Sequence, residues 1–180
     1  PGRLRPRSLR RLPAGKLYVP SAYTGAPLPL VILLHGYSAN GGAEDLYLTM
    51  KATAEAKSVF YMHPDGTVDS TGNHFWNASD ACCDFGKTGV DDSSYLAGLV
   101  AEIETRYAID KKRVYFVGHS NGGLMSYRMA CDHADIVTGI MSLAGAMPID
   151  PSTCPPSAPV SVRQAHGTKD DEVHFDGFAG

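Results

Sequence analysis

Short continuous apolar runs alternate along the chain with segments of helical periodicity. Five such runs are expected to be strands: residues 28–34 (LPLVILL), 58–62 (SVFYM), 113–117 (RVYFV), 136–143 and 160–165. The short segment 16–20 is also strand-like. Runs of this kind are typical of strands buried on both faces of a parallel sheet.

Three intervening segments have apolar residues at helical spacing: residues 44–57, about 92–107, and 124–131. Asp91 or Asp92 can cap the second of these helices. Strands that alternate with helices predict an α/β fold with a mostly parallel sheet covered by helices on both faces. The segment 67–88 interrupts this pattern as a long polar loop, and loops of such length in compact domains are usually functional.

The chain has 180 residues, which suits one domain. Its net charge is −3, but five of the 16 basic residues lie within the first eleven, so the rest holds 11 basic against 19 acidic residues, about −8. We interpret residues 1–15 as a basic, poorly ordered arm and residues 16–180 as the domain. The domain has no basic patch, which argues against a nucleic-acid partner. No apolar run is long enough for a membrane span.

The segment Gly118-His119-Ser120-Asn121-Gly122 contains the strongest chemical signal. A serine hydroxyl is a poor nucleophile unless a base removes its proton and the turn presents its oxygen to the substrate. Gly-x-Ser-x-Gly between a strand and a helix meets the second need, and here RVYFV precedes the pattern and GLMSYRMA follows it. We therefore predict Ser120 as a catalytic nucleophile. An ordinary Gly-rich turn is the alternative.

An oxyanion needs two preorganised N–H groups. We expect them from Asn121, directly after the nucleophile, and from Tyr37, in the loop after the first long strand. His35 in the same loop is expected to be a hydrogen-bonded structural residue. Tyr37 and Trp76 could also form an aromatic wall for substrate, although Trp76 could equally pack within the long loop.

The acid that orients the base should follow a later strand. Asp170, just past VSVRQA, fits this place, with Asp171 as its rival. His174 is the one histidine after Asp170, but it follows too closely for the usual later loop, and His119 is expected to point away from Ser120. We therefore expect the base to lie in sequence beyond Gly180 and the domain to be incomplete at its C-terminus, with little activity from residues 1–180 alone.

Four cysteines are present: Cys82, Cys83, Cys131 and Cys154. None of their spacings matches a zinc site, and the sequence suggests no metal or cofactor. Their even number predicts disulfides and an oxidising compartment, either secreted or periplasmic. Because a bridge between adjacent cysteines is strained, we expect Cys82 and Cys83 to bond to Cys131 and Cys154, in either combination.

Four segments together resemble the secreted esterases grouped with poly(3-hydroxybutyrate) depolymerases, feruloyl esterases and acetylxylan esterases. They are PLPLVILLHGYSANG, WNASDACC followed by GVDDSSYL, RVYFVGHSNGGLMSYRMAC and AHGTKDDEV. The resemblance implies an α/β-hydrolase fold, Ser120 as nucleophile, Asp170 as triad acid, disulfide-bonded cysteines near WNASDACC and no cofactor. It also implies an ester substrate, possibly polymeric, cleaved through an acyl-serine intermediate. The alternatives are a serine peptidase of the same fold and a binding module that has lost its base.

Overall fold

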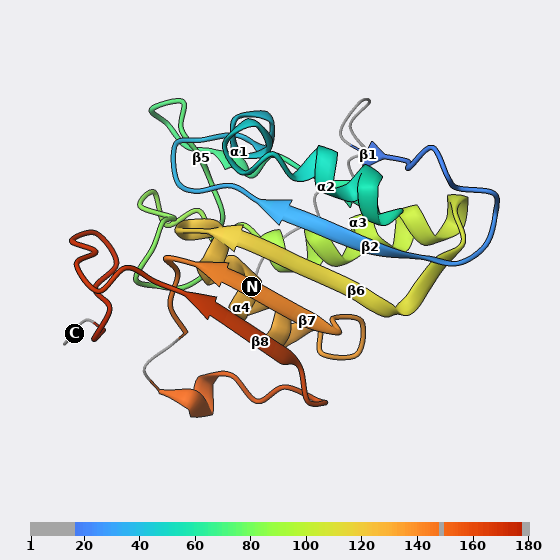
Figure 1. Ribbon diagram of the computed structural model, residues 1–180. Helices are drawn as coiled ribbons and strands as arrows, with labels where there is room; N and C mark the ends of the chain where they lie inside the picture. Colours follow the sequence, from blue (N-terminus) through green and yellow to red (C-terminus); the bar gives the residue numbers. More distant parts are fainter. Residues whose placement is uncertain (1–16, 148–149, 178–180) are drawn as a thin grey trace.

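A six-stranded sheet forms the centre of the computed structural model, which describes residues 17–147 and 150–177. Its strand order is β1-β3-β2-β6-β7-β8 (Figure 1). Every neighbouring pair is parallel except β1 with β3. The predicted, mostly parallel sheet is therefore confirmed, whereas the expected arm at residues 1–15 lies outside the described residues.

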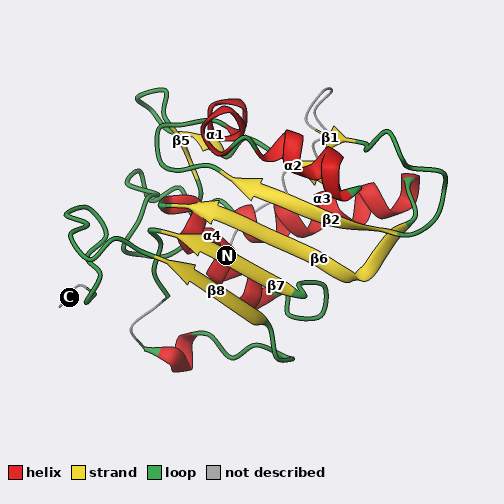
Figure 2. Ribbon diagram, in the orientation of Figure 1, coloured by secondary structure: helices red, strands yellow, loops and turns green. Residues whose placement is uncertain are grey.

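The strands and helices alternate as predicted (Figure 2). The sheet strands are β1 Leu17–Tyr18, β2 Leu28–Leu34, β3 Phe60–Met62, β6 Ile109–His119, β7 Gly139–Leu143 and β8 Ser161–Ala165. The α-helices are α1 Gly41–Leu48, α2 Met50–Lys57, α3 Asp92–Arg106 and α4 Asn121–Asp132. A short hairpin, β4 Thr67–Val68 with β5 His74–Phe75, lies in the long loop, and a 3₁₀ turn occupies Pro151–Thr153.

The core lies on both faces of the sheet, because successive residues of a buried strand point to opposite sides. On one face, Ile32 and Leu34 of β2 pack in a large cluster with Leu96 of α3 and Met125 of α4. On the other face, Leu33 packs in a smaller cluster with residues of α2 and β3. Helices thus cover both faces, and β2 and β6 lie at the centre of the sheet.

Two elements differ from their sequence-based predictions in more than the position of an end. The helix expected over residues 44–57 begins earlier, at Gly41, where Asn40 caps it, and breaks at Thr49, whose φ of 50° is left-handed. The Asp45 carboxylate accepts the Lys51 N–H (3.1 Å) across this break, as side chains that compete with helical hydrogen bonds do. Strand β8 is exposed rather than buried, with Val162 53% exposed, because β7 is its one neighbour among the described strands.

The cysteine pairing also differs from the prediction. Cys82 is bonded to Cys83, and Cys131 is bonded to Cys154. Cys131 lies near the C-terminal end of α4, whereas the loop before Cys82 is attached near the N-terminal end of that helix, through Trp76. Ten residues of helix, about 15 Å, separate Cys131 from this point of attachment, and the 3₁₀ turn brings Cys154 to within 4.9 Å of Cys131 between Cα atoms.

Within residues 17–147 and 150–177, no helix combines the length and the apolar character that crossing a membrane would require.

Candidate active site

Ser120 occupies a sharp turn between the end of β6 and the start of α4. Its backbone has φ 52° and ψ −119°, a conformation that a non-glycine residue adopts only when its surroundings enforce it. The Ser120 N–H donates to the Leu143 carbonyl of β7 (2.8 Å), and the Ser120 carbonyl accepts the Leu124 N–H of α4 (3.0 Å). The turn therefore has the geometry predicted for a nucleophile elbow.

Two glycines make this turn possible. A Cβ at Gly118 would lie 2.0 Å from the Gly122 carbonyl oxygen, and a Cβ at Gly122 would lie 2.2 Å from the Leu34 carbonyl oxygen. Both obstacles are backbone atoms, which cannot rotate away as a side chain can. The small residues on either side of Ser120 thus allow β2, β6 and α4 to approach closely enough to hold the elbow.

The elbow opens into a cleft of about 310 Å³. Gly36, Tyr37, Ala39, Ala43, Glu44, Tyr47, His119 and Ser120 line it. The lining comes from three places: the loop after β2, helix α1, and the end of β6. These places meet because the carboxyl ends of parallel strands lie at one edge of the sheet, where ligands bind in open α/β sheets.

Two backbone N–H groups are available at this edge. In the described part of the chain, hydrogen bonds engage the N–H groups of Gly36, Ser38 and Ala39 but provide no protein acceptor for that of Tyr37. Asn121 is the first residue of α4, and the first N–H groups of a helix have no partner within the helix. Tyr37 and Asn121 therefore have free donors on the two segments that face the cleft.

The loop that carries Tyr37 is held by His35. This imidazole is fully buried; its Nε2 accepts the Gly66 N–H (2.9 Å) and its Nδ1 contacts the Gly36 carbonyl oxygen (2.8 Å). Nδ1 must therefore be the protonated nitrogen, because it faces an acceptor. Burial lowers the pKa of His35 and favours this neutral form. With both nitrogens occupied, His35 has a structural environment, in agreement with the sequence-based interpretation.

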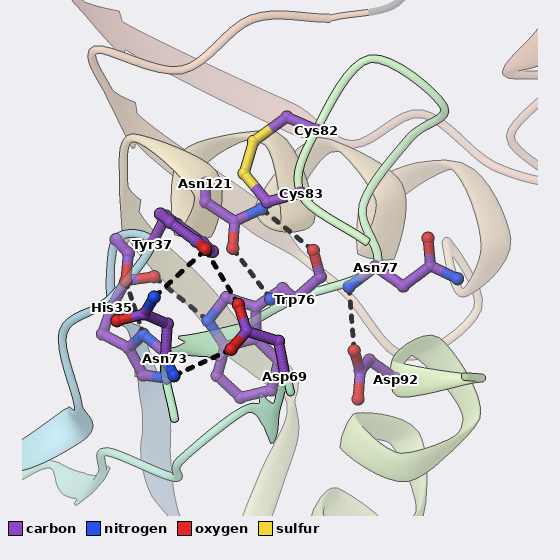
Figure 3. Close-up of a disulfide and its surroundings, with 11 residues drawn as sticks. His35, Tyr37, Asp69, Asn73, Trp76, Asn77, Cys82, Cys83, Asp92 and Asn121 are labelled. Carbon is purple, nitrogen blue, oxygen red and sulfur yellow. Dashed lines mark hydrogen bonds between the residues drawn. A yellow bond between two sulfur atoms is a disulfide. The ribbon is translucent and has the colours of Figure 1, made fainter. Parts of the chain in front are cut away.

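The β4–β5 hairpin fixes the same loop from the other side. The Tyr37 hydroxyl donates to Asp69 Oδ2 (2.8 Å) and accepts from Asn73 Nδ2 at 3.3 Å (Figure 3). The Ser38 N–H donates to the His74 carbonyl (2.9 Å). Hydrogen bonds from Thr71, Asn73 and Tyr37 hold the pKa of Asp69 well below its usual range, so this anchor is ionised at neutral pH.

Trp76 does not line the cleft, in contrast to the expectation that its ring contacts substrate. Its side chain is completely buried, and its indole N–H donates to the His35 carbonyl (3.1 Å). The Asn121 side chain closes a reciprocal pair with the Trp76 backbone, accepting its N–H (2.8 Å) and donating to its carbonyl at 2.9 Å (Figure 3). Trp76 therefore attaches the long loop to the elbow, because its polar atom finds a partner inside the core.

Asp170 follows β8, the second strand beyond β6 in the sheet. Its Oδ1 accepts the N–H groups of Glu172 (3.0 Å) and Val173 (2.9 Å), which hold the pKa of this carboxyl below its usual range. Backbone N–H groups thus fix the Asp170 carboxylate in the turn after β8, and β8 ends at the same edge of the sheet as β6 (Figure 1).

His166 contacts Asp170 but is fully engaged. Its Nε2 lies 2.6 Å from the Val173 carbonyl oxygen and 3.4 Å from Asp170 Oδ2, and its Nδ1 lies 3.0 Å from Gln164 Nε2. An Nε2–H donor and an Nδ1 acceptor satisfy these contacts. The imidazole therefore holds the turn that contains Asp170.

His119 and Glu44 form a pair that the sequence did not suggest. His119 lines the cleft together with Ser120, in contrast to the expectation that it points away. That expectation assumed that neighbouring side chains in a turn point apart, but with Ser120 at φ 52° and ψ −119° both residues line the cleft. The His119 Nδ1 lies 3.2 Å from Oε1 of Glu44, whose side chain is 4% exposed. In the sequence, nothing distinguishes Glu44 from any other acidic residue near the start of a helix.

The comparisons with known proteins agree with this architecture. The chain is 29% identical over 163 residues to a protein named putative esterase NocK from Nocardia uniformis subsp. tsuyamanensis, covering 88% of this chain and 46% of that protein. It is also 29% identical over 164 residues to feruloyl esterase B from Piromyces equi, covering 88% and 29%. The chain thus spans less than half the length of these relatives.

A solved structure has the same fold. The crystal structure of esterase PE8 superposes with a TM-score of 0.69 at 18% identity, covering 91% of this chain and 78% of that one. Residues 22–176, which include the elbow and the turn of Asp170, match the family described as Phospholipase/Carboxylesterase. The sheet, the elbow and this match together show that the chain belongs to the phospholipase/carboxylesterase family and has the α/β-hydrolase fold.

Proposed function

We propose that this chain carries the nucleophile, the oxyanion donors and the triad acid of a serine carboxylic-ester hydrolase. One observation carries the proposal: Ser120 lies in a left-handed turn beside a cleft, with the free N–H groups of Tyr37 and Asn121 on the two adjoining segments. Membership in a family of carboxylesterases supports it.

In the proposed reaction, Ser120 Oγ attacks the ester carbonyl carbon while a base takes its proton. The carbonyl oxygen becomes an oxyanion, which the N–H groups of Tyr37 and Asn121 stabilise. The carbon–oxygen bond to the alcohol then breaks, and the base returns the proton to the departing alkoxide. Water, deprotonated by the same base, hydrolyses the acyl-serine and regenerates the hydroxyl.

The base of this proposal is a histidine oriented by Asp170, and it is none of His35, His119 and His166. The environments of three histidines support this assignment. Both ring nitrogens of His35 and of His166 are occupied, and His119 uses Nδ1 to pair with Glu44. Asp170 lies in a turn held by backbone N–H groups, as an orienting acid requires.

The substrates that we propose are feruloyl or acetyl esters of plant polysaccharide, or polyesters of the polyhydroxyalkanoate type. The cleft is lined by two tyrosine rings, Tyr37 and Tyr47, and by the small residues Ala39 and Ala43. An aromatic acyl group or a flat polyester segment can stack against such rings. Two disulfides favour a secreted or periplasmic protein.

Replacement of Ser120 in the natural full-length protein tests the proposal. Ser120→Ala should reduce kcat for p-nitrophenyl butyrate by about 10³-fold or more without changing the melting temperature. An alkyl fluorophosphonate should add to the peptide that contains Ser120 in the wild type and not in the variant. Ser94→Ala, at an exposed position of α3, is the matched control. Near wild-type turnover by Ser120→Ala would refute the assignment.

A panel of methyl ferulate, acetylated xylan and polyhydroxybutyrate film would then assign the substrate class. Hydrolysis of none of these three, by a protein that cleaves p-nitrophenyl butyrate through Ser120, would refute the proposed substrates and leave the mechanism standing.

A further inference from the structure

Glu44 is a buried carboxylate at the base of the cleft. It lies in the first turn of α1, where its own N–H donates to the Asn40 carbonyl (3.0 Å), and it is 4% exposed. Burial of a carboxylate is costly unless partners compensate its charge. The partners of Glu44 are therefore informative about why the residue lies there.

The two carboxylate oxygens contact the two halves of the proposed site. Oε2 accepts the Gly36 N–H (3.3 Å), in the loop that carries Tyr37. Oε1 lies 3.2 Å from Nδ1 of His119, the residue before the nucleophile. The loop after β2 and the elbow after β6 are thus joined through one side chain of α1.

The contact with Gly36 restricts the direction of the Tyr37 N–H. The Gly36 carbonyl, in the same planar peptide group as that N–H, contacts the Ala39 N–H (3.3 Å) and His35 Nδ1 (2.8 Å). The N–H of a trans peptide points opposite to its carbonyl. Because Gly36 is bonded on both sides of its Cα, through its N–H and its carbonyl, the Tyr37 N–H has little freedom to rotate.

His119 completes this connection through its Nδ1. The Glu44 carboxylate raises the pKa of His119, and the charge of Asp170 adds to this effect. The groups that face the imidazole are Glu44 of α1, the Tyr47 ring at 5.8 Å, also of α1, and Asp170 of the turn after β8. The 3.2 Å contact between Nδ1 and Glu44 Oε1 is an ion-pair contact whenever the imidazole is protonated, the form that the raised pKa favours.

We propose that Glu44 is a positioning residue that sets the oxyanion loop at Gly36 against the nucleophile elbow at His119. This inference rests on the proposed esterase function. Stabilisation of an oxyanion acts in the transition state and depends steeply on the placement of its donors. Loss of Glu44 should therefore reduce kcat more than it changes KM.

The test compares Glu44→Gln and Glu44→Ala with Asp45→Asn in the full-length protein. Asp45 is the matched control: it is the next residue of α1, its carboxylate accepts the Tyr61 hydroxyl (2.8 Å) and the Lys51 N–H (3.1 Å), and it does not line the cleft. Active sites are counted by fluorophosphonate labelling, so that misfolded molecules do not enter kcat. We expect kcat per labelled site to fall about 10- to 100-fold in Glu44→Ala, with KM within about 3-fold.

Glu44→Gln should recover part of this loss. Its amide oxygen can still accept one of the two N–H donors, but it lacks the charge that favours protonated His119. Asp45→Asn should retain wild-type kcat per site even where its melting temperature falls. Unchanged kcat per site in Glu44→Ala would overturn the proposal, as would an equal loss in Asp45→Asn.

Two measurements do not depend on ester hydrolysis. Nuclear magnetic resonance should show a His119 pKa above the ordinary value of 6.5 in the wild type and a lower pKa in Glu44→Gln. Amide hydrogen exchange at Gly36 should be faster in Glu44→Ala. If wild-type Ser120 does not react with the fluorophosphonate, the proposed function fails. These two measurements then still show whether Glu44 holds the Gly36 loop against His119. If neither changes, Glu44 does not hold the loop.

Discussion

The bond between Cys131 and Cys154 gives a stability prediction that can be calculated from its place in the chain. It joins residues 23 positions apart, at the end of α4 and after the 3₁₀ turn. In the chain-entropy model, closing a loop of this length stabilises the folded state by about 3 kcal/mol. The Cys82–Cys83 bond joins adjacent residues and constrains almost no chain in the unfolded state. The two disulfides should therefore differ strongly in their effect.

The assay is reversible urea unfolding under non-reducing conditions. The double replacement of Cys131 and Cys154 by alanine should lower the free energy of unfolding by about 3 kcal/mol. In a separate thermal experiment, the same loss should lower the melting temperature by about 6–12 °C for a domain of this size. The same replacement of Cys82 and Cys83 is the control, and it should cost clearly less. Equal losses in the two variants, or peptide mapping that links the Cys82-Cys83 peptide to Cys131 or Cys154, would refute the pairing and the reasoning from it.

Two further predictions concern the site. Gly122→Ala should lower the free energy of unfolding by about 1–3 kcal/mol or more and reduce kcat per labelled site, since its Cβ would lie 2.2 Å from a backbone carbonyl oxygen of β2. The control is Gly167→Ala, whose Cβ would meet no atom within 4 Å, and it should change the free energy of unfolding by less than about 0.5 kcal/mol. Equal effects of the two variants in thermal unfolding would contradict the packing argument. Asp170→Asn should reduce kcat for p-nitrophenyl butyrate by about 10³- to 10⁴-fold, whereas Asp171→Asn should stay within a few-fold; the reverse order would transfer the role of the acid to Asp171.

Local patterns in the sequence predicted the framework well. The run 28–34 became β2 without a change of bounds, and the elbow follows β6 directly, as the strand–Gly-x-Ser-x-Gly–helix order indicates. Apolar periodicity and Gly spacing are decided within a few residues of the chain. That is why they can be recognised without knowledge of the tertiary structure.

Features that depend on contacts between distant segments were missed. The Cys131–Cys154 pairing and the exposure of β8 each depend on which segment lies beside which. The Glu44–His119 pair has a separation of 75 residues and no local signature. Trp76 illustrates the same limit, because an aromatic residue in a polar loop can equally line a cleft or fill a core.

Asn121 uses its side chain to hold Trp76, 45 residues earlier in the chain, and it is also the first residue of α4. The elbow itself is local in sequence and can form early, but contacts across such separations form late in folding, because each must first overcome the entropy of closing a long loop. A folding intermediate that has β6 and α4 but lacks the docked long loop would thus present Ser120 without the oxyanion hole that we propose. In such a protein the onset of ester hydrolysis during refolding would mark completion of the tertiary structure, later than the recovery of helical signal.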